Sequence, residues 1–137
     1  MCYKTEASKS FLKRFYPLEA EYKAIRETLD GLQGMKYEQR SKSISRKNVD
    51  TRLNGKLDKL DVIQRQMDEI EACIDEVEDD RSRTILRCKY TLHENLYKVS
   101  ERMFYSYDHT KAALHPKALR QFYDVLVKRG HVKEQSV

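Results

Sequence analysis

Apolar and aromatic residues recur every three or four positions along the first part of the chain, which is the period of an α-helix with one buried face. This first stripe comprises Leu12, Phe15, Leu18, Tyr22, Ile25, Leu29 and Leu32. Pro17 lies inside the stripe, so it either kinks the helix or stands in its first turn. Residues 18–32 are therefore the secure core of a first long helix, and Gly31 and Gly34 mark its end.

A second stripe with the same period follows a gap in the pattern. It comprises Leu53, Leu57, Leu60, Ile63, Met67, Ile70, Ile74 and Val77. Two such stripes joined by a loop predict an antiparallel helical hairpin over residues 1–79. The near-heptad spacing suits coiled-coil packing, either within the hairpin or across a homodimer. We expect pairing within one chain, because each stripe has a partner in reach, and the dimer through the hairpin is the alternative.

The segment between the stripes, at about residues 34–51, loses the periodicity and is predicted to be a loop. Its basic residues are Lys36, Arg40, Lys42, Arg46 and Lys47. A charge-rich segment of this kind is most often a solvated loop, and the alternative is a basic arm that touches phosphates.

The last part of the chain predicts several shorter helices. Asp79 or Asp80 is a suitable N-cap for "RSRTILRCKYTL", in which the inward residues are Ile85, Leu86, Tyr90 and Cys88. Asn95 caps a helix over residues 96–103, whose apolar face is Leu96, Val99 and Met103. Ser106 then caps a further helix, with Thr110, Ala113 and Leu114 inward. Two short helices joined by about three residues predict a helix-turn-helix domain over residues 80–128, followed by a flexible tail over residues 129–137.

Composition agrees with this series of helices. Of the 137 residues, 36% are charged, while only 4 are Gly and 2 are Pro, as is typical of long solvated helices. We therefore predict an all-α protein. The net charge of +5 is unevenly distributed: residues 1–80 carry 15 Lys and Arg against 17 Asp and Glu, and residues 81–137 carry 12 against 5. The second part is basic, which favours a polyanionic partner such as double-stranded DNA, or is simply a basic soluble face.

The helix after Ser106 offers the side chains that DNA reading requires. Base edges in the major groove are read by polar side chains near a helix N-terminus, while surrounding Lys and Arg neutralise phosphates. Asp108 has the chemistry to accept from a cytosine amino group. The predicted DNA-binding residues are Tyr107, Asp108, His109, Lys111, Lys117, Arg120, Arg81, Arg83, Arg87, Lys98 and Arg102.

The order "DDRSRTILRCKY", "NLYKVSERMFYS" and "LHPKALRQF" resembles the phage and prophage ArpU/RinA-like transcriptional regulators, whose C-terminal part is similar to the helix-turn-helix of sigma-70 region 4. The resemblance covers about residues 80–123. It implies a regulator of transcription, with late genes as its targets, in the cytoplasm of a bacterial host.

The chain departs from the family pattern at three places. Phe104 stands where the family has a turn glycine, so a bulky residue at positive φ would be strained there. One extra residue separates Ser106 from the Leu114–His115 pair. Pro116 follows that pair, so the recognition helix either ends near Leu114, with a final helix restarting at Pro116, or is kinked.

Other classes of protein find little support in the residues. The sequence contains no phosphate-binding glycine loop, no HExxH motif and no nucleophile beside a base, so we expect no enzyme and no cofactor. The three cysteines have no zinc-ligand spacing, so we expect no metal and a reducing compartment. No segment is apolar enough for a signal peptide or a membrane span. The alternative function is a helical adaptor or inhibitor that binds a host protein such as RNA polymerase.

Overall fold

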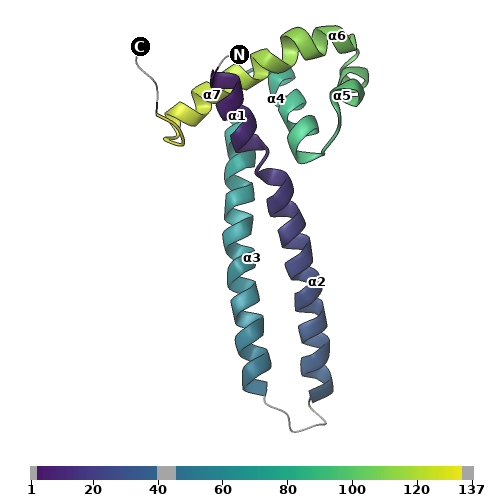
Figure 1. Cartoon of the computed structure of the whole chain (residues 1–137), viewed down its shortest axis with the longest axis vertical. Helices are drawn as coiled ribbons and strands as arrows, with labels where there is room; N and C mark the ends of the chain where they lie inside the picture. Colours follow the sequence, from purple (N-terminus) through teal and green to yellow (C-terminus); the bar gives the residue numbers. More distant parts are fainter. Residues whose placement is uncertain (1–2, 40–45, 134–137) are drawn as a thin grey trace. The chain divides into compact units, whose positions relative to one another are not determined.

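The computed structural model describes residues 3–39 and 46–133, with side chains described for residues 3–31 and 51–133 (Figure 1). No residue in these ranges lies in a strand, so the predicted all-α fold is confirmed. The elements in chain order are α1 (Tyr3–Leu12), α2 (Phe15–Gln39), α3 (Arg46–Asp75), α4 (Asp80–Leu86), the π-helical turn η1 (Arg87–Thr91), α5 (Leu96–Met103), α6 (Tyr107–His109), the π-helical turn η2 (Thr110–Leu114) and α7 (His115–Lys128).

The chain divides into two compact units. We call Pro17–Met67 the hairpin unit, and Met1–Tyr16 together with Asp68–Val137 the head unit. This division differs from the predicted one, which assigned residues 1–79 to the hairpin. Both ends of that range belong to the head unit instead.

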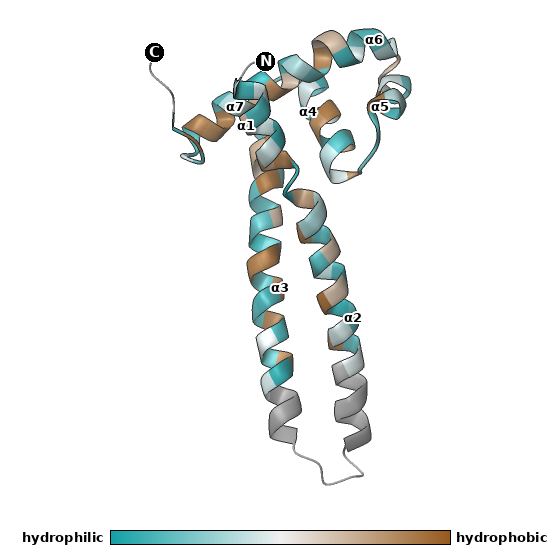
Figure 2. Cartoon of the chain, viewed as in Figure 1, coloured by the Kyte–Doolittle hydropathy of each residue, from teal (hydrophilic) through white to brown (hydrophobic). Residues whose placement is uncertain are grey.

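The hairpin unit is held by the two predicted apolar stripes. Leu29 packs with Leu53, and Ile25 packs with Leu60 and Ile63. Earlier residues of α2 therefore meet later residues of α3, and the helices are antiparallel, as predicted. Apolar positions recur along both helices in Figure 2. The stripes pair within one chain, and the dimer through the hairpin stays a prediction.

Three details of the predicted hairpin change. Pro17 was predicted either to kink the first helix or to stand in its first turn. The second alternative holds, because α2 begins at Phe15. Leu57 is 45% exposed and lies at the edge of its stripe. The predicted loop at about residues 34–51 is shorter than expected, because α2 continues to Gln39 and α3 begins at Arg46. Residues 40–45 and the side chains of the predicted basic arm lie outside the described residues.

The head unit is built around α7. Its apolar residues Leu119, Phe122 and Leu126 are almost completely buried. The Phe11 ring of α1 lies 5.9 Å from that of Phe122, and the hydroxyl of Ser8 donates to the carbonyl of Leu119 at 2.7 Å. These contacts explain why the first residues of the chain belong with its last helix.

The segment after α7 is docked, in contrast to the predicted flexible tail. Arg129 pairs with Glu69 and Glu76, and the imidazole of His131 lies 4.8 Å from the Phe11 ring. Residues 129–133 therefore form part of the head unit, since ion pairs and a ring contact hold them. Residues 134–137 lie outside the described residues.

The contact between α1 and α7 predicts that a single ring in α1 stabilises the head unit. Phe11 is 7% exposed, so Phe11→Ala should lower the free energy of unfolding by about 3 kcal/mol, as the loss of a buried ring usually does. Urea denaturation followed by circular dichroism measures this. Lys13→Ala, on an exposed neighbour, should change stability by less than about 0.5 kcal/mol. Equal stability of Phe11→Ala and Lys13→Ala would show that α1 does not support the head unit.

Candidate nucleic-acid interface

The helix that supports the site begins at the predicted cap. The carboxylate of Asp79 accepts from the backbone N–H of Arg81 at 3.1 Å and from the hydroxyl of Ser82 at 3.2 Å. Burial acts to raise the pKa of Asp79, but these hydrogen bonds and the charges of Lys117 and Arg81 together hold the pKa below its usual value. Asp79, and not Asp80, is therefore the N-cap of α4.

Two successive helices of the head unit have the predicted helix-turn-helix order. The side chain of Asn95 accepts from the N–H of Lys98 at 2.8 Å, and that of Ser106 accepts from the N–H of His109 at 3.1 Å. Both predicted caps are confirmed. Between them, Val99 packs with Ile85 and Cys88, with Met103 and Leu114 against the same cluster. The inward faces of these helices are therefore largely those that the sequence predicts.

The turn between α5 and α6 is formed by a phenylalanine in a left-handed conformation. Phe104 has φ 62° and ψ 35°, and its side chain is 94% exposed. A residue with a Cβ is strained at this φ, whereas glycine is not. The Phe104 ring makes no buried contact, so packing does not offset the free-energy cost of this backbone conformation.

Replacing this residue should therefore stabilise the protein. Phe104→Gly removes the backbone strain and loses no core contact. The free energy of unfolding should therefore rise by about 0.5–1 kcal/mol, a value that already subtracts the larger entropy cost of ordering glycine on folding. Phe104→Ala is the matched control, because it removes the ring and keeps the strain. Thermal denaturation compares the two variants, and a glycine variant no more stable than the alanine variant would contradict the explanation.

The recognition helix does not end at Leu114. His115 donates its N–H to the carbonyl of Thr110, and Leu114 and His115 both have right-handed helical backbones. α6, η2 and α7 thus continue into one another, so of the two predicted alternatives the end near Leu114 is wrong, and a helix that continues with a local distortion is what the structure has. A π turn is wider than an α turn, so it relieves the crowding between a proline ring and the preceding turn. The helix is locally distorted at η2 instead of interrupted.

The same π turn alters which residues face inward. Thr110 is 1% exposed, as predicted, but Ala113 is exposed although the period of an α-helix placed it inward. A π turn advances each residue by a smaller angle than an α turn, so the face shifts within η2.

The predicted base-reading residues are brought together at the start of this long helix. Tyr107, Asp108, His109 and Lys111 are all exposed. The Tyr107 ring lies 6.1 Å from that of Tyr97, and the Lys111 ammonium lies 5.9 Å from the centre of the Tyr107 ring. None of the four residues forms an ion pair within the described part of the chain. Their polar groups are therefore open to a partner.

Most of the predicted phosphate contacts already have partners inside the head unit. These pairs are Arg83 with Asp80, Arg87 with Asp75, Lys98 with Glu94, Arg102 with Glu94, and Lys117 with Asp79. Glu94 is 8% exposed, and its hydrogen bond from Arg102 holds its pKa below the usual value. Arg81 donates to the hydroxyl of Tyr105 at 2.8 Å. These cations already have partners within the head unit. Among the described residues, Lys111 and Arg120 are the predicted Lys and Arg residues with neither an ion pair nor a side-chain hydrogen bond.

The structure adds three lysines that the sequence did not single out. Lys9 of α1, Lys13 just after α1 and Lys89 of η1 line a cavity of about 470 Å³ together with Lys111. We call it the basic cavity, because no carboxylate lines it. Lys89 lies in the segment "DDRSRTILRCKY", which the sequence places in this domain. Lys9 and Lys13 could not be assigned to the site without knowing that α1 packs on α7.

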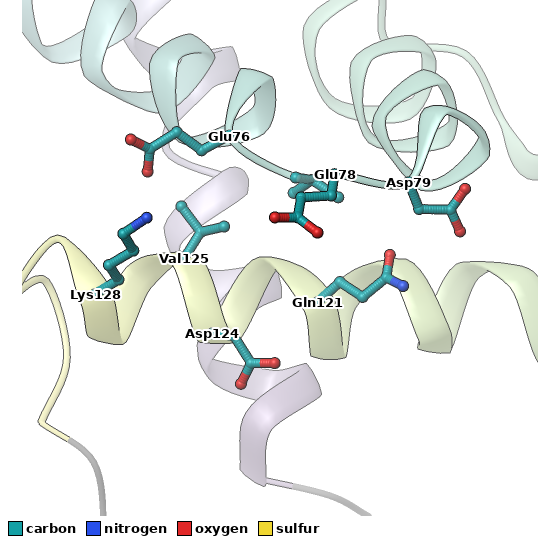
Figure 3. Close-up of a pocket in the computed structure, with 8 residues that line it drawn as sticks. Glu76, Glu78, Asp79, Gln121, Asp124, Val125 and Lys128 are labelled. Carbon is teal, nitrogen blue, oxygen red and sulfur yellow. The ribbon is translucent and has the colours of Figure 1, made fainter.

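The opposite charge gathers elsewhere in the head unit. A cavity of about 280 Å³ beside the connection from α3 to α4 is lined by Glu76, Glu78, Asp79 and Asp124, with Lys128 at its side (Figure 3). A polyanion is repelled by such a surface. The basic cavity and the exposed first turns of the helix after Ser106 are therefore the parts of the head unit that suit a polyanion best.

A buried pair lies at the base of the basic cavity. The hydroxyl of Tyr90 and Nε2 of His115 are 2.9 Å apart. Burial, together with the smaller effect of the nearby charges of Lys89 and Lys9, lowers the pKa of His115 to about 4. Burial also raises the pKa of Tyr90. Neutral His115 therefore accepts a hydrogen bond from a protonated Tyr90 at neutral pH.

This pair predicts a loss of stability in weak acid. Unfolded His115 takes up a proton below its usual pKa of about 6.5, whereas the folded protein resists protonation down to pH of about 4. The free energy of unfolding should therefore fall by about 3 kcal/mol as the pH drops across this window. His115→Asn should reduce this pH dependence, and His109→Asn, on the exposed surface, should keep it. Urea denaturation at several pH values measures both slopes, and equal slopes for the two variants would contradict the assignment.

No protein-family model matches the chain, and searches of curated proteins and of solved structures found no match. Within residues 3–39 and 46–133, no helix has both the length and the apolar content needed to cross a lipid bilayer.

Proposed function

We propose that the protein is a sequence-specific DNA-binding transcriptional regulator of a phage or prophage, which reads double-stranded DNA with the helix after Ser106. The observation that carries this proposal is the exposed cluster Tyr107, Asp108, His109 and Lys111 at the N-terminal end of a helix that follows a capped turn. A helix presented in this way fits the major groove, where its first residues meet base edges.

The polar side chains on these first turns have distinct parts in recognition. The carboxylate of Asp108 accepts from the amino group of cytosine, and it repels the acceptor atoms of guanine. His109 and Tyr107 offer donors and acceptors to bases or to phosphate oxygens. Lys111, four residues after Tyr107, neutralises a phosphate at the edge of the groove.

The phosphate contacts come from fewer cations than the sequence predicted. Lys111 and Arg120 keep their predicted part, and the lysines of the basic cavity, Lys9, Lys13 and Lys89, extend the positive surface. The arginines paired with Asp75, Asp80 and Glu94 contribute less, because a contact with DNA would compete with their existing partners. We therefore expect about five phosphate contacts and a moderate dependence on salt.

This proposal predicts the salt dependence of binding. Five phosphate contacts give a slope of about −4 to −5 for the logarithm of the association constant against that of the salt concentration. Lys111→Ala should weaken binding by about 1 kcal/mol and make the slope smaller by about 1. Lys128→Ala, which removes the same charge beside the acidic cavity, should leave both nearly unchanged. Fluorescence anisotropy with a random duplex and with host promoter duplexes measures these values.

The contrary result is simple to recognise. Absence of binding to either type of duplex at low salt would overturn the proposal, and equal effects of Lys111→Ala and Lys128→Ala would remove the assigned site. Selection of genomic fragments by the purified protein then supplies the target sequence.

The second candidate function is an adaptor or inhibitor that binds a host protein such as RNA polymerase. Two large exposed rings favour it, since Phe104 is 94% and Tyr97 59% exposed. Exposed aromatic residues are typical of protein-binding surfaces. If this function holds, the protein binds purified RNA polymerase after nuclease treatment, Phe104→Ala abolishes that binding, and Lys111→Ala has little effect on it.

A further inference from the structure

Three side chains with different metal-binding atoms meet in the head unit, away from the proposed DNA-binding surface. They are Glu69 and Cys73 of α3 and His131, which follows α7. One carboxylate oxygen, the thiol sulfur and one imidazole nitrogen all lie within 4.8 Å of one another. The sequence contains no zinc motif because the third ligand comes from a segment far along the chain.

The positions of Glu69 and Cys73 follow from the helix itself. Residues four apart lie on the same face of an α-helix, one turn from each other. Cys73 is fully buried, while the carboxylate of Glu69 and the imidazole of His131 are partly exposed. An ion can therefore enter past the two exposed ligands and meet the sulfur at the inner end of the site.

A chain reversal at the end of α7 brings His131 to α3. Gly130 has φ +81° and donates its N–H to the carbonyl of Val127 at 3.1 Å, and His131 donates to that of Leu126 at 2.9 Å. This is a Schellman motif, and its left-handed position suits glycine. The ring of Phe11, 4.8 Å from the imidazole, packs against His131 and orients it.

The spacing of the ligand atoms is close to that required by zinc. In a tetrahedral zinc site the ligand atoms lie about 3.3–3.6 Å from one another, given the usual zinc–ligand distances. Nε2 of His131 and Oε2 of Glu69 are 3.4 Å apart, which already meets this requirement. No pair exceeds 4.8 Å, so shifts of about 1 Å complete the set.

The surrounding charges also suit a divalent ion. Arg129 donates through Nε to Oε1 of Glu69 at 3.0 Å and pairs through Nη1 with Glu76 at 2.9 Å. Oε2 of Glu69 lies 3.4 Å from Nε2 of His131 and accepts a longer hydrogen bond, from Nη2 of Arg129 at 3.2 Å. The metal would replace this longer bond at Oε2, while Arg129 keeps its hold on Oε1. A zinc ion with one carboxylate and one thiolate is neutral, and Arg129 with Glu76 is neutral as well.

We propose that Glu69, Cys73 and His131 bind one zinc ion, with water as the fourth ligand. Binding releases the thiol proton of Cys73 to the solvent, because the thiolate is the form that coordinates zinc. The ion fastens the segment after α7 to α3 and so stabilises the head unit. This site does not depend on the proposed binding of DNA.

Cobalt is the direct probe, since its visible and near-ultraviolet absorption reports tetrahedral coordination and bonding to a thiolate. Titration of the reduced, metal-free, full-length protein with Co²⁺ should give these bands at a 1:1 ratio, and Zn²⁺ should abolish them. Cys73→Ser should remove the thiolate-to-cobalt band, and His131→Ala should weaken binding at least tenfold. Cys88→Ser, Cys2→Ser and His109→Ala are the matched controls, and each should give the same cobalt bands and the same affinity for the metal as the unaltered protein.

A second measurement uses the His131 and His109 variants, so it does not depend on correct folding of the Cys73 variant. Zn²⁺ should raise the melting temperature of the unaltered protein and of His109→Ala by the same amount, and that of His131→Ala by much less. Absence of the cobalt bands at equimolar metal, or their persistence in Cys73→Ser, would overturn the proposal. An equal rise in melting temperature for His131→Ala and His109→Ala would also overturn it.

Discussion

The head unit depends on the packing of one helix, α7, whose buried face carries Leu119, Phe122 and Leu126. α1 lies against this face through the ring of Phe11 and the hydroxyl of Ser8. The N-terminal end of the same helix continues into the proposed recognition helix, and its C-terminal end leads to Arg129 and His131. Hydrophobic burial along α7 therefore sets the positions of both proposed sites, since each is built on one of its ends.

The two π turns have related effects on the proposed DNA-binding surface. η1 brings Tyr90 inward and places Lys89 at the basic cavity, while η2 carries the helix past Pro116 without a break. A wider turn changes which side chains face the solvent, so small backbone differences decide which cations are exposed. Within η2, Ala113 is exposed as a result, whereas Thr110 and Lys111 keep the buried and exposed positions that an α-helix would give them.

The count of Lys and Arg along the sequence overstated the positive charge that the folded protein exposes to a partner. The second part of the chain is strongly basic, but Arg83, Arg87 and Arg102 pair with carboxylates of the head unit. Such pairs contribute to the conformation of the molecule and reduce its external field. The basic cavity recovers part of that field with Lys9 of α1 and Lys13 just after it, which the charge count had assigned to the acidic part of the chain.

The sequence by itself determined the elements whose causes are local. The periods of the two stripes predicted the hairpin, and the capping residues Asp79, Asn95 and Ser106 placed the starts of three helices, because both signals act over about one helical turn. The tertiary structure alone decided which distant segments meet. The docking of α1 on α7, the ion pairs of the arginines and the approach of His131 to Cys73 all depend on long-range packing, which no local pattern encodes. The structure also decided between the two courses that the sequence left open at Pro116, because the π turn η2 lets the helix continue past the proline.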